Sequence, residues 1–246
     1  MLSRKFGLIG TPLTHSFSKK YFEAKFLNEN KPDCMYDNFD IPNSDQLALF
    51  LESNELEGFN VTIPYKEQII PFLISIDSRA KRVGAVNCVK RIGNGWEGFN
   101  TDIIGFEKSL VPLLTSEHQQ ALVLGTGGAS LSVCFVFKQL GIPYQLVSTQ
   151  PEAGEIGYSE VTNTLLFQYQ IIINCTPLGT FPNIEEAPTL PYHAISSQHL
   201  CFDLIYNPEE TLFLSQCKAQ GAQIKNGKEM LEIQAEESWK IWNRAE

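Results

Sequence analysis

The stretch GFNVTIPYKE, residues 58–67, brings together three polar side chains of different chemistry. Asn60 and Thr62 alternate with two aliphatic residues, which is typical of a strand with one polar and one apolar face. Pro64 ends that strand, and Lys66 follows directly. Amide and hydroxyl groups bind the hydroxyls of a ligand, and a lysine ammonium can supply a proton or stabilise developing negative charge. An edge strand in water would show the same pattern without any function, so other parts of the chain must decide.

Further polar residues occur where strands or turns are expected to end in the first hundred residues. Ser16 and Ser18 lie where the first strand meets the first helix, and backbone N–H groups at such a point can bind an anion. Asn87 follows a strand, and Asn100 and Asp102 lie where we expect a domain boundary. Each has an ordinary structural interpretation, because serine and aspartate cap helices and asparagine forms turns. Taken singly, these residues leave both interpretations open.

A glycine-rich turn, GTGGAS, occupies residues 125–130 between an apolar strand and an apolar helix. Gly125 permits a tight turn, and Gly127 allows the backbone to approach a pyrophosphate at the helix N-terminus. Ser130 takes the third position of the GxGxxG pattern. In this strand–turn–helix context the pattern favours dinucleotide binding over an ordinary turn.

The next predicted strand ends in Ser148, Thr149 and Gln150. An acidic residue at this point would bind the ribose hydroxyls of NAD, and an arginine would bind the 2′-phosphate of NADP. Neither is present. Ser148 and Thr149 can donate hydrogen bonds to a phosphate, although more weakly than a guanidinium. These residues therefore leave the choice of nucleotide open.

Strand and helix patterns alternate along the whole chain. In the first part we expect strands at 5–10, 35–40, 58–63, 84–91 and 96–100, and helices at 18–28, 44–54 and 66–76. In the second part we expect strands at 121–124, 144–148, 171–175, 200–206 and 222–227, a helix that follows the glycine-rich turn and ends at residue 140, and a last helix at 229–242. This alternation predicts an α/β fold with parallel or mixed sheets, in two units that meet near residues 100–106. Strands that are apolar throughout suit the centre of a sheet covered on both faces.

Composition excludes several classes of protein. The net charge is -9 with no basic cluster, so we expect no nucleic-acid partner. No stretch approaches the ~20 apolar residues that span a bilayer, and residues 1–13 do not resemble a signal peptide. No CxxC pair occurs, so we expect free thiols in a reduced, cytoplasmic compartment and no metal site. The six cysteines are Cys34, Cys88, Cys134, Cys175, Cys201 and Cys217.

The motifs HSFS, NVTIPYK, GAVN, NTDIIGF, GTGGAS, INCTPLG, DLIYNP and NGKEMLEIQA, in this order and spacing, resemble the shikimate dehydrogenase family over nearly the whole chain. The resemblance implies an α/β substrate-binding domain at 1–101, a Rossmann-type parallel-sheet domain at 102–228, and a C-terminal helix at 229–246 that returns to the first domain. It also implies an oxidoreductase of chorismate and aromatic amino-acid biosynthesis. Its reaction would be the reversible, NADPH-dependent reduction of 3-dehydroshikimate to shikimate, by a monomer or homodimer.

The resemblance implies roles for individual residues as well. Lys66 and Asp102 match the catalytic pair of the family. The substrate-binding residues would be Ser16 and Ser18 at the carboxylate, Asn60, Thr62, Asn87, Asp102 and Gln234 at the hydroxyls and reacting oxygen, and Tyr206 between substrate and nicotinamide. The cofactor-binding residues would be Gly125, Gly127, Gly128, Ala129, Ser148, Thr149, Thr176, Pro177, Leu178, Ile205, Gly227 and Met230. Simple core packing on an amphipathic helix is the alternative for Met230.

Three features depart from the family pattern. Lys19 replaces a proline that commonly follows the second serine, and we expect its charge to attract a carboxylate. Ser148, Thr149 and Gln150 replace an Asn-Arg-Thr sequence whose arginine recognises the 2′-phosphate, so NADP rests on the resemblance and NAD use stays open. The chain stops four residues after Trp242, where many relatives continue through another helix. We expect that difference to affect domain closure or self-association.

Two alternatives compete with a biosynthetic shikimate dehydrogenase. One is a quinate/shikimate dehydrogenase that uses NAD. The other is a non-catalytic metabolite sensor that keeps the pocket without the chemistry. The presence of both Lys66 and Asp102 favours an enzyme, because a sensor does not need a proton donor.

Overall fold

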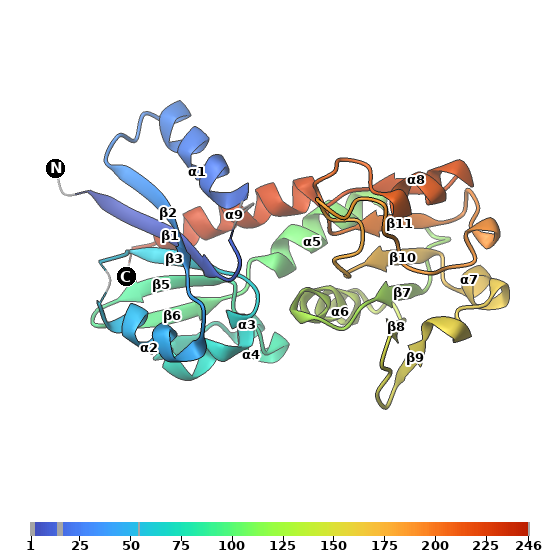
Figure 1. Cartoon of the computed structure of the whole chain (residues 1–246), viewed down its shortest axis with the longest axis horizontal. Coiled ribbons are helices and arrows are strands. Elements are labelled where there is room, and N and C mark those ends of the chain that lie inside the picture. The colour runs from blue at the N-terminus through green and yellow to red at the C-terminus, as the bar shows by residue number, and fades with distance from the viewer. Residues whose placement is uncertain (1–2, 14–16, 54, 246) are drawn as a thin grey trace. The chain divides into compact units, whose positions relative to one another are not determined.

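The computed structural model describes residues 3–13, 17–53 and 55–245, and it divides into two compact units. Unit 1 consists of Met1–Ile104 and Glu232–Glu246, and unit 2 consists of Gly105–Leu231. Figure 1 shows that each unit contains its own sheet and its own helices. Unit 1 is therefore built from two separate parts of the chain, because its last helix arrives from the other end of the sequence.

The sheet of unit 1 is mixed and has six strands in the order β2-β1-β3-β5-β6-β4. β1 is parallel to β2 and β3, whereas β5 is antiparallel to β3 and β6, and β4 is parallel to β6. The strands are β1 (Arg4–Gly10), β2 (Cys34–Asp40), β3 (Gly58–Val61), β4 (Ser75–Ile76), β5 (Cys88–Ile92) and β6 (Gly95–Phe99). The helices of the first part of the chain are α1 (Phe17–Asn28), α2 (Ser44–Ser53), α3 (Tyr65–Gln68) and α4 (Ser78–Val83).

Helices cover both faces of this sheet. On one face, Phe6 of β1 packs against α1 and against α9 (Lys228–Trp242), where its ring stacks on Trp242 at 4.9 Å between centroids. On the other face, Phe59 of β3 packs with Leu47 and Leu51 of α2. The C-terminal helix thus completes the core of unit 1, as the predicted return of this helix requires.

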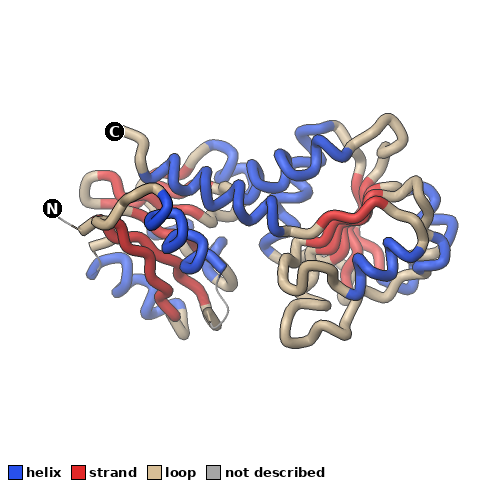
Figure 2. Tube along the Cα trace, turned by 90° about the horizontal axis from the view of Figure 1, so that it is seen from above, coloured by secondary structure: helices blue, strands red, loops and turns tan. Residues whose placement is uncertain are grey.

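The sheet of unit 2 is entirely parallel, in the order β12-β11-β10-β7-β8-β9. Counted from β7 as the first strand, this is the 3-2-1-4-5-6 order of a Rossmann-type fold, with its switch point between β7 and β10. The strands are β7 (Ala121–Leu124), β8 (Tyr144–Ser148), β9 (Glu155–Gly157), β10 (Ile171–Asn174), β11 (Leu200–Asp203) and β12 (Gln223–Lys225). The remaining helices are α5 (Asp102–Leu110), α6 (Gly128–Leu140), α7 (Asn163–Gln168) and α8 (Leu212–Ala219). Figure 2 shows the strands of the sheets in red with helices in blue beside them.

The predicted α/β class is confirmed, and β7, β10 and β11 are buried along their whole length, as their apolar sequences require. The expected helix over 66–76 is wrong. It is replaced by the single turn of α3, a 3₁₀ turn at Ile70–Phe72 and the short strand β4. Pro71 lies at the start of that 3₁₀ turn, where its missing N–H and its ring disfavour a continuous α-helix.

The apolar face expected for residues 58–63 is also wrong in part. β3 ends at Val61, and the Tyr65 N–H donates to the Thr62 carbonyl to close a turn. Ile63 lies in that turn and is 70% exposed. Within the described part of the chain, no helix has both the length and the apolar character to cross a bilayer.

Candidate active site

Lys66 and Asp102 form an ion pair in unit 1. Lys66 Nζ donates to Asp102 Oδ2 at 2.7 Å, and the two side chains are only 16% and 11% exposed. A pair so shielded from water is held more firmly than a surface pair, because less solvent screens the two charges. The two residues that the sequence singled out for proton transfer are therefore in direct contact.

Local backbone structure brings the two side chains together. The turn after β3 starts the one-turn helix α3, and the Val86 N–H donates to the Lys66 carbonyl at 2.8 Å. On the other side, Asn100 Oδ1 accepts the Ile103 N–H at the start of α5. Because Asn100 provides this cap, the Asp102 carboxylate is available to Lys66.

Asn60 lies in a buried polar network beside this pair. Its Oδ1 accepts the Tyr36 hydroxyl at 2.9 Å, and its Nδ2 donates to Ser238 Oγ at 2.9 Å and to the Asn87 carbonyl at 3.2 Å. Asn60 is 4% exposed, so these bonds offset the cost of burying its amide. The network draws on β2, β3 and α9, which are far apart in sequence.

Thr101 links the other members of the network. Its N–H donates to Asn87 Oδ1 at 2.6 Å, and its hydroxyl lies 3.3 Å from both Gln234 Oε1 and Ser238 Oγ. Ser238 in turn donates to the Gln234 carbonyl one helical turn earlier. Gln234 therefore belongs to the same cluster as Asn60 and Asn87, although it comes from the C-terminal helix.

The expected carboxylate-binding serines are placed only in part. Ser16 lies outside the described residues, whereas Ser18 hydrogen-bonds the buried Tyr36 hydroxyl that also reaches Asn60. Lys19 donates to Asp37 Oδ1 at 2.7 Å, so its charge is already paired with a carboxylate of this chain. The expected attraction of Lys19 for a ligand carboxylate is correspondingly weakened.

Thr62 follows β3 directly and is half-buried. Its methyl group lies against β1, where a Cβ on Gly10 would come within 2.4 Å of Thr62 Cγ2. Sequence reasoning did not single out Tyr36, Thr101 or Ser238. Thr101 stands beside Asp102 in a motif already recognised, and Ser238 lies one helical turn after Gln234, so both had a local signal.

The glycine-rich turn of unit 2 has the shape that a pyrophosphate requires. Gly125 has φ +92°, and its N–H donates to the Val147 carbonyl at 2.8 Å. Gly127 is the N-cap of α6 without any side-chain cap, and a Cβ there would meet no atom within 4 Å. The N–H groups of Gly128 and Ala129 belong to the first turn of α6, where an α-helix provides no acceptors. These residues fit a bound dinucleotide.

Thr176 lies across the switch point from this turn. A Cβ on Gly125 would come within 3.0 Å of Thr176 Cγ2, so only glycine allows this approach. Thr176 is held by Asn174, whose Oδ1 accepts both the Thr176 N–H at 3.0 Å and its hydroxyl at 2.7 Å. The Thr176 hydroxyl also accepts the Leu178 N–H, which shapes the following loop.

Asp203 anchors this loop to the next one. Its carboxylate accepts Asn174 Nδ2 at 3.1 Å, the Ile205 N–H at 3.0 Å and the Thr211 hydroxyl at 2.6 Å. Burial raises the pKa of Asp203 to about 6, and the three hydrogen bonds oppose that rise. Sequence reasoning missed Asn174, Asp203 and Thr211, because their role is to hold the loops and not to face solvent.

The residues expected near the nicotinamide occupy the same edge of unit 2. The Gly227 N–H donates to the Ile205 carbonyl at 3.0 Å, and a Cβ on Gly227 would lie 2.0 Å from the Leu204 carbonyl oxygen. Ile205 and Met230 are buried, and Tyr206 is half-buried. Close backbone packing is therefore enough to explain why a glycine occupies position 227, without any contact to a ligand.

Ser148 ends β8 beside the glycine-rich turn and is buried, whereas Thr149 and Gln150 are exposed. The Ser148 hydroxyl accepts the Gln150 N–H at 3.2 Å, which folds the chain back into a tight turn. The hydroxyl proton of Ser148 can still be donated to a ligand.

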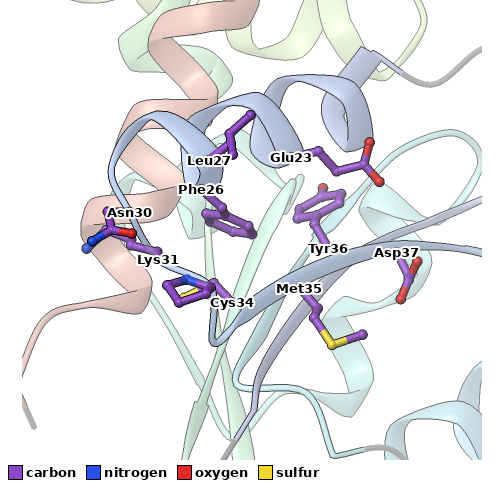
Figure 3. Close-up of a pocket in the computed structure, with 10 residues that line it drawn as sticks. Glu23, Phe26, Leu27, Asn30, Lys31, Cys34, Met35, Tyr36 and Asp37 are labelled. Atoms are coloured by element: carbon purple, nitrogen blue, oxygen red, sulfur yellow. The ribbon is translucent and has the colours of Figure 1, made fainter.

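A separate hollow of about 350 Å³ lies between α1 and β2, lined by side chains such as Phe26, Lys31 and Met35 (Figure 3). It contains none of the predicted site residues. Over residues 3–13, 17–53 and 55–245, no three His, Cys, Asp or Glu side chains are grouped as a metal ion requires. All six cysteines are free thiols.

Comparison with known proteins places these two sites in a family context. The family model described as the shikimate dehydrogenase substrate binding domain matches residues 8–89. A shikimate dehydrogenase (NADP(+)) of Caldicellulosiruptor saccharolyticus is 33% identical over 97% of this chain and 92% of its own. One of Staphylococcus haemolyticus is 35% identical with the same coverage.

Solved structures of known proteins are similar to this one over nearly the whole chain. A chorismate mutase/shikimate 5-dehydrogenase fusion protein of Clostridium acetobutylicum superposes with a TM-score of 0.87 and 34% identity, over 99% of this chain and 92% of that one. Shikimate 5-dehydrogenase of Thermus thermophilus, in complex with NADP(H) and shikimate, gives a TM-score of 0.84 and 28% identity over 99% and 94% of the two chains.

Proposed function

The chain belongs to the shikimate dehydrogenase family, and we propose that it catalyses the reversible NADPH-dependent reduction of 3-dehydroshikimate to shikimate. The observation that carries this proposal is the shielded Lys66–Asp102 pair at 2.7 Å beside a buried network of amides and hydroxyls. Such a network suits a ligand that presents several hydroxyl groups, because amides and hydroxyls can both donate hydrogen bonds to them and accept hydrogen bonds from them.

In this proposal one unit binds the substrate and the other binds the cofactor. Unit 1 binds the substrate through Ser16, Ser18, Asn60, Thr62, Asn87 and Gln234. Unit 2 binds the cofactor through the glycine-rich turn, the end of β8, and residues Thr176, Ile205, Gly227 and Met230. The open N-terminus of α6 supports the cofactor assignment, because uncapped N–H groups attract a pyrophosphate.

Lys66 is the proton donor of the proposed reaction. The nicotinamide of NADPH, when bound by unit 2, would supply the hydride that reduces the carbonyl carbon of the substrate. The Lys66 ammonium donates a proton to the carbonyl oxygen as negative charge develops there, and takes it back in the reverse direction. Asp102 holds the Lys66 ammonium in place and accepts a hydrogen bond from an adjacent substrate hydroxyl.

We further propose that the protein acts in the cytoplasm, since its six cysteines are all free thiols. The proposed state of association is a monomer or a homodimer, to be determined by light scattering after gel filtration.

Replacing Lys66 by alanine tests the proposed mechanism. We expect turnover of shikimate with NADP+ to fall by about 10²- to 10⁴-fold, because the reacting oxygen loses its proton donor and acceptor. Shikimate binding, measured by calorimetry, should change by less than about tenfold, because the hydroxyl-binding network stays intact.

Lys5→Ala is the matched control. Lys5 lies near the start of β1, where it pairs with the exposed Glu55, and it plays no part in the proposed site. It should leave both measurements unchanged. Turnover of the Lys66→Ala protein at more than a tenth of the original rate would show that Lys66 is not the proton donor. Absence of turnover in the unaltered protein, with shikimate bound, would favour the metabolite sensor instead.

A further inference from the structure

Unit 2 is poorly equipped to bind the extra phosphate that distinguishes NADP from NAD. All five arginines of the chain lie in unit 1: Arg4, Arg79, Arg82, Arg91 and Arg244. Unit 2 has lysines but no arginine, and none of its lysines lies between residues 139 and 217. That stretch contains β8, β9, β10, β11 and the loops that follow them.

The end of β8 is the place where a 2′-phosphate would be recognised. In a Rossmann-type sheet the residues after the second strand contact the adenosine ribose. Here the Gly125 N–H donates to the Val147 carbonyl at 2.8 Å, so the glycine-rich turn and the end of β8 are adjacent. The donors at this point are the hydroxyls of Ser148 and Thr149 and the amide of Gln150.

Two of the lysines of unit 2 are too far from this point to help. Lys138 lies over the Tyr144 ring at 5.9 Å, at the opposite end of β8, roughly 13 Å of strand away from Ser148. Lys225 lies in β12, four strands across the sheet from β8, or about 19 Å. Lys225 and Lys218 also form ion pairs with Glu229 and Glu210.

Nearby charge is negative instead. Glu152 lies in the turn after β8, and its backbone N–H donates to Oε2 of Glu155, the first residue of β9, at 3.1 Å. Two carboxylates therefore lie close after the end of β8. A 2′-phosphate brings further negative charge to this turn. Hydroxyl donors bind such a group more weakly than a guanidinium, which forms two charge-assisted hydrogen bonds at once.

We propose that this cofactor site discriminates only weakly between NADP and NAD, with dissociation constants within about tenfold of each other. This inference rests on the proposed function, since it concerns the nucleotide site of that enzyme. The pyrophosphate cradle is intact, so both nucleotides bind through the part that they share. The 2′-phosphate adds only the hydrogen bonds of neutral donors.

The test measures dissociation constants of NADP+ and NAD+ for the full-length protein by calorimetry, together with turnover of shikimate with each. We expect a ratio within about tenfold that changes little as salt is raised, because residues 139–217, which include the end of β8, contain no lysine or arginine. Thr149→Arg should tighten NADP+ binding by at least about tenfold relative to NAD+ binding. The Thr149→Arg substitution should also make the ratio of the two dissociation constants depend on salt. Gln150→Arg adds the charge one residue later and is a second variant in which NADP+ binding should tighten.

Gln168→Arg is the matched control. Gln168 ends α7 just before β10 begins, so it lies at the amino ends of the parallel strands, whereas Ser148 lies at their carboxyl ends. The Gln168→Arg variant adds the same charge to unit 2 and should not alter the ratio of the NADP+ and NAD+ dissociation constants. A ratio above about tenfold in the unaltered protein, or a ratio that falls steeply with salt, would overturn the inference by revealing a cation at the phosphate. Failure of shikimate turnover with both nucleotides would count against the proposed function itself, whatever the binding ratio.

Discussion

At the scale of single residues, the site depends on polar atoms that satisfy one another away from water. Asn60, Thr101 and Ser238 are each at most 4% exposed, yet the side chain of each makes hydrogen bonds. Unpaired, such groups would cost about 1–3 kcal/mol each, so the network fixes the side-chain positions before a ligand arrives. The Lys66–Asp102 pair lies against this prearranged network and need not be assembled by the substrate.

Asp203 leads to a prediction for the pH dependence of stability. Its pKa is raised from 3.8 to about 6, so the folded protein keeps a proton that the unfolded chain releases between these values. Stability from this group is therefore fully present at low pH and is lost as pH rises toward 6. The total effect is on the order of 3 kcal/mol.

Urea unfolding of the unaltered protein and of Asp203→Asn, at several pH values from 7 to 5, isolates this effect. We expect the free energy of unfolding of the unaltered protein to gain about 1 kcal/mol relative to the variant over that range. All other titrating groups are common to both proteins and cancel. A difference that does not change with pH would show that the pKa of Asp203 is not raised.

At the scale of elements, the two loops at the carboxyl ends of β11 and β12 are fixed by close backbone packing. Gly227 shows this most clearly, because a Cβ at this position would lie only 2.0 Å from the Leu204 carbonyl oxygen. We expect Gly227→Ala to lower the free energy of unfolding by about 2–3 kcal/mol, since backbone atoms must move apart. Thermal or urea unfolding would measure the loss.

Gly157→Ala is the control for that experiment. Gly157 has φ -82°, and a Cβ there would meet no atom closer than 3.6 Å. Alanine is therefore expected to change the free energy of unfolding by less than about 1 kcal/mol, because the reduced freedom of the unfolded chain offsets small losses in the folded one. Equal losses in the two variants would mean that Gly227 is not held against Leu204.

Elements with strong apolar patterns were predictable from sequence. β7 and β10 follow their predicted ranges closely, and α6 ends at Leu140 as predicted, because uninterrupted apolar runs have few alternatives. β9 and α7 were not predicted, because three to six residues carry too little periodicity. The region from 66 to 76 was mistaken for one helix, since the effect of Pro71 outweighed a pattern that is otherwise helical.

The same division applies to the site. Lys66 and Asp102 were found from their motifs, and their contact agrees with the chemistry expected of them. Tyr36 was not found, because a single tyrosine in a strand is most often a core residue. Its hydroxyl joins Ser18 to Asn60 only once β2 and β3 lie in the same sheet, and no local pattern reports that arrangement.

At the scale of the whole molecule, charge and chain order distinguish the two units. Unit 1 is completed by the end of the chain, where Trp242 donates to the Val89 carbonyl at 3.0 Å and stacks on Phe6. Unit 2 is continuous in sequence, lacks arginine, and carries a Rossmann-type strand order. A site for a hydroxylated substrate in one unit and a nucleotide cradle in the other are the two components that a dehydrogenase needs.

The measurement that tests this account most directly is the absorbance of reduced nicotinamide in a solution of the purified protein with shikimate and NADP+. The account predicts that absorbance rises steadily in proportion to protein, and that quinate in place of shikimate gives slower turnover. No rise with shikimate and either nucleotide, while calorimetry shows both ligands bound, would contradict the assignment of this protein as a shikimate dehydrogenase.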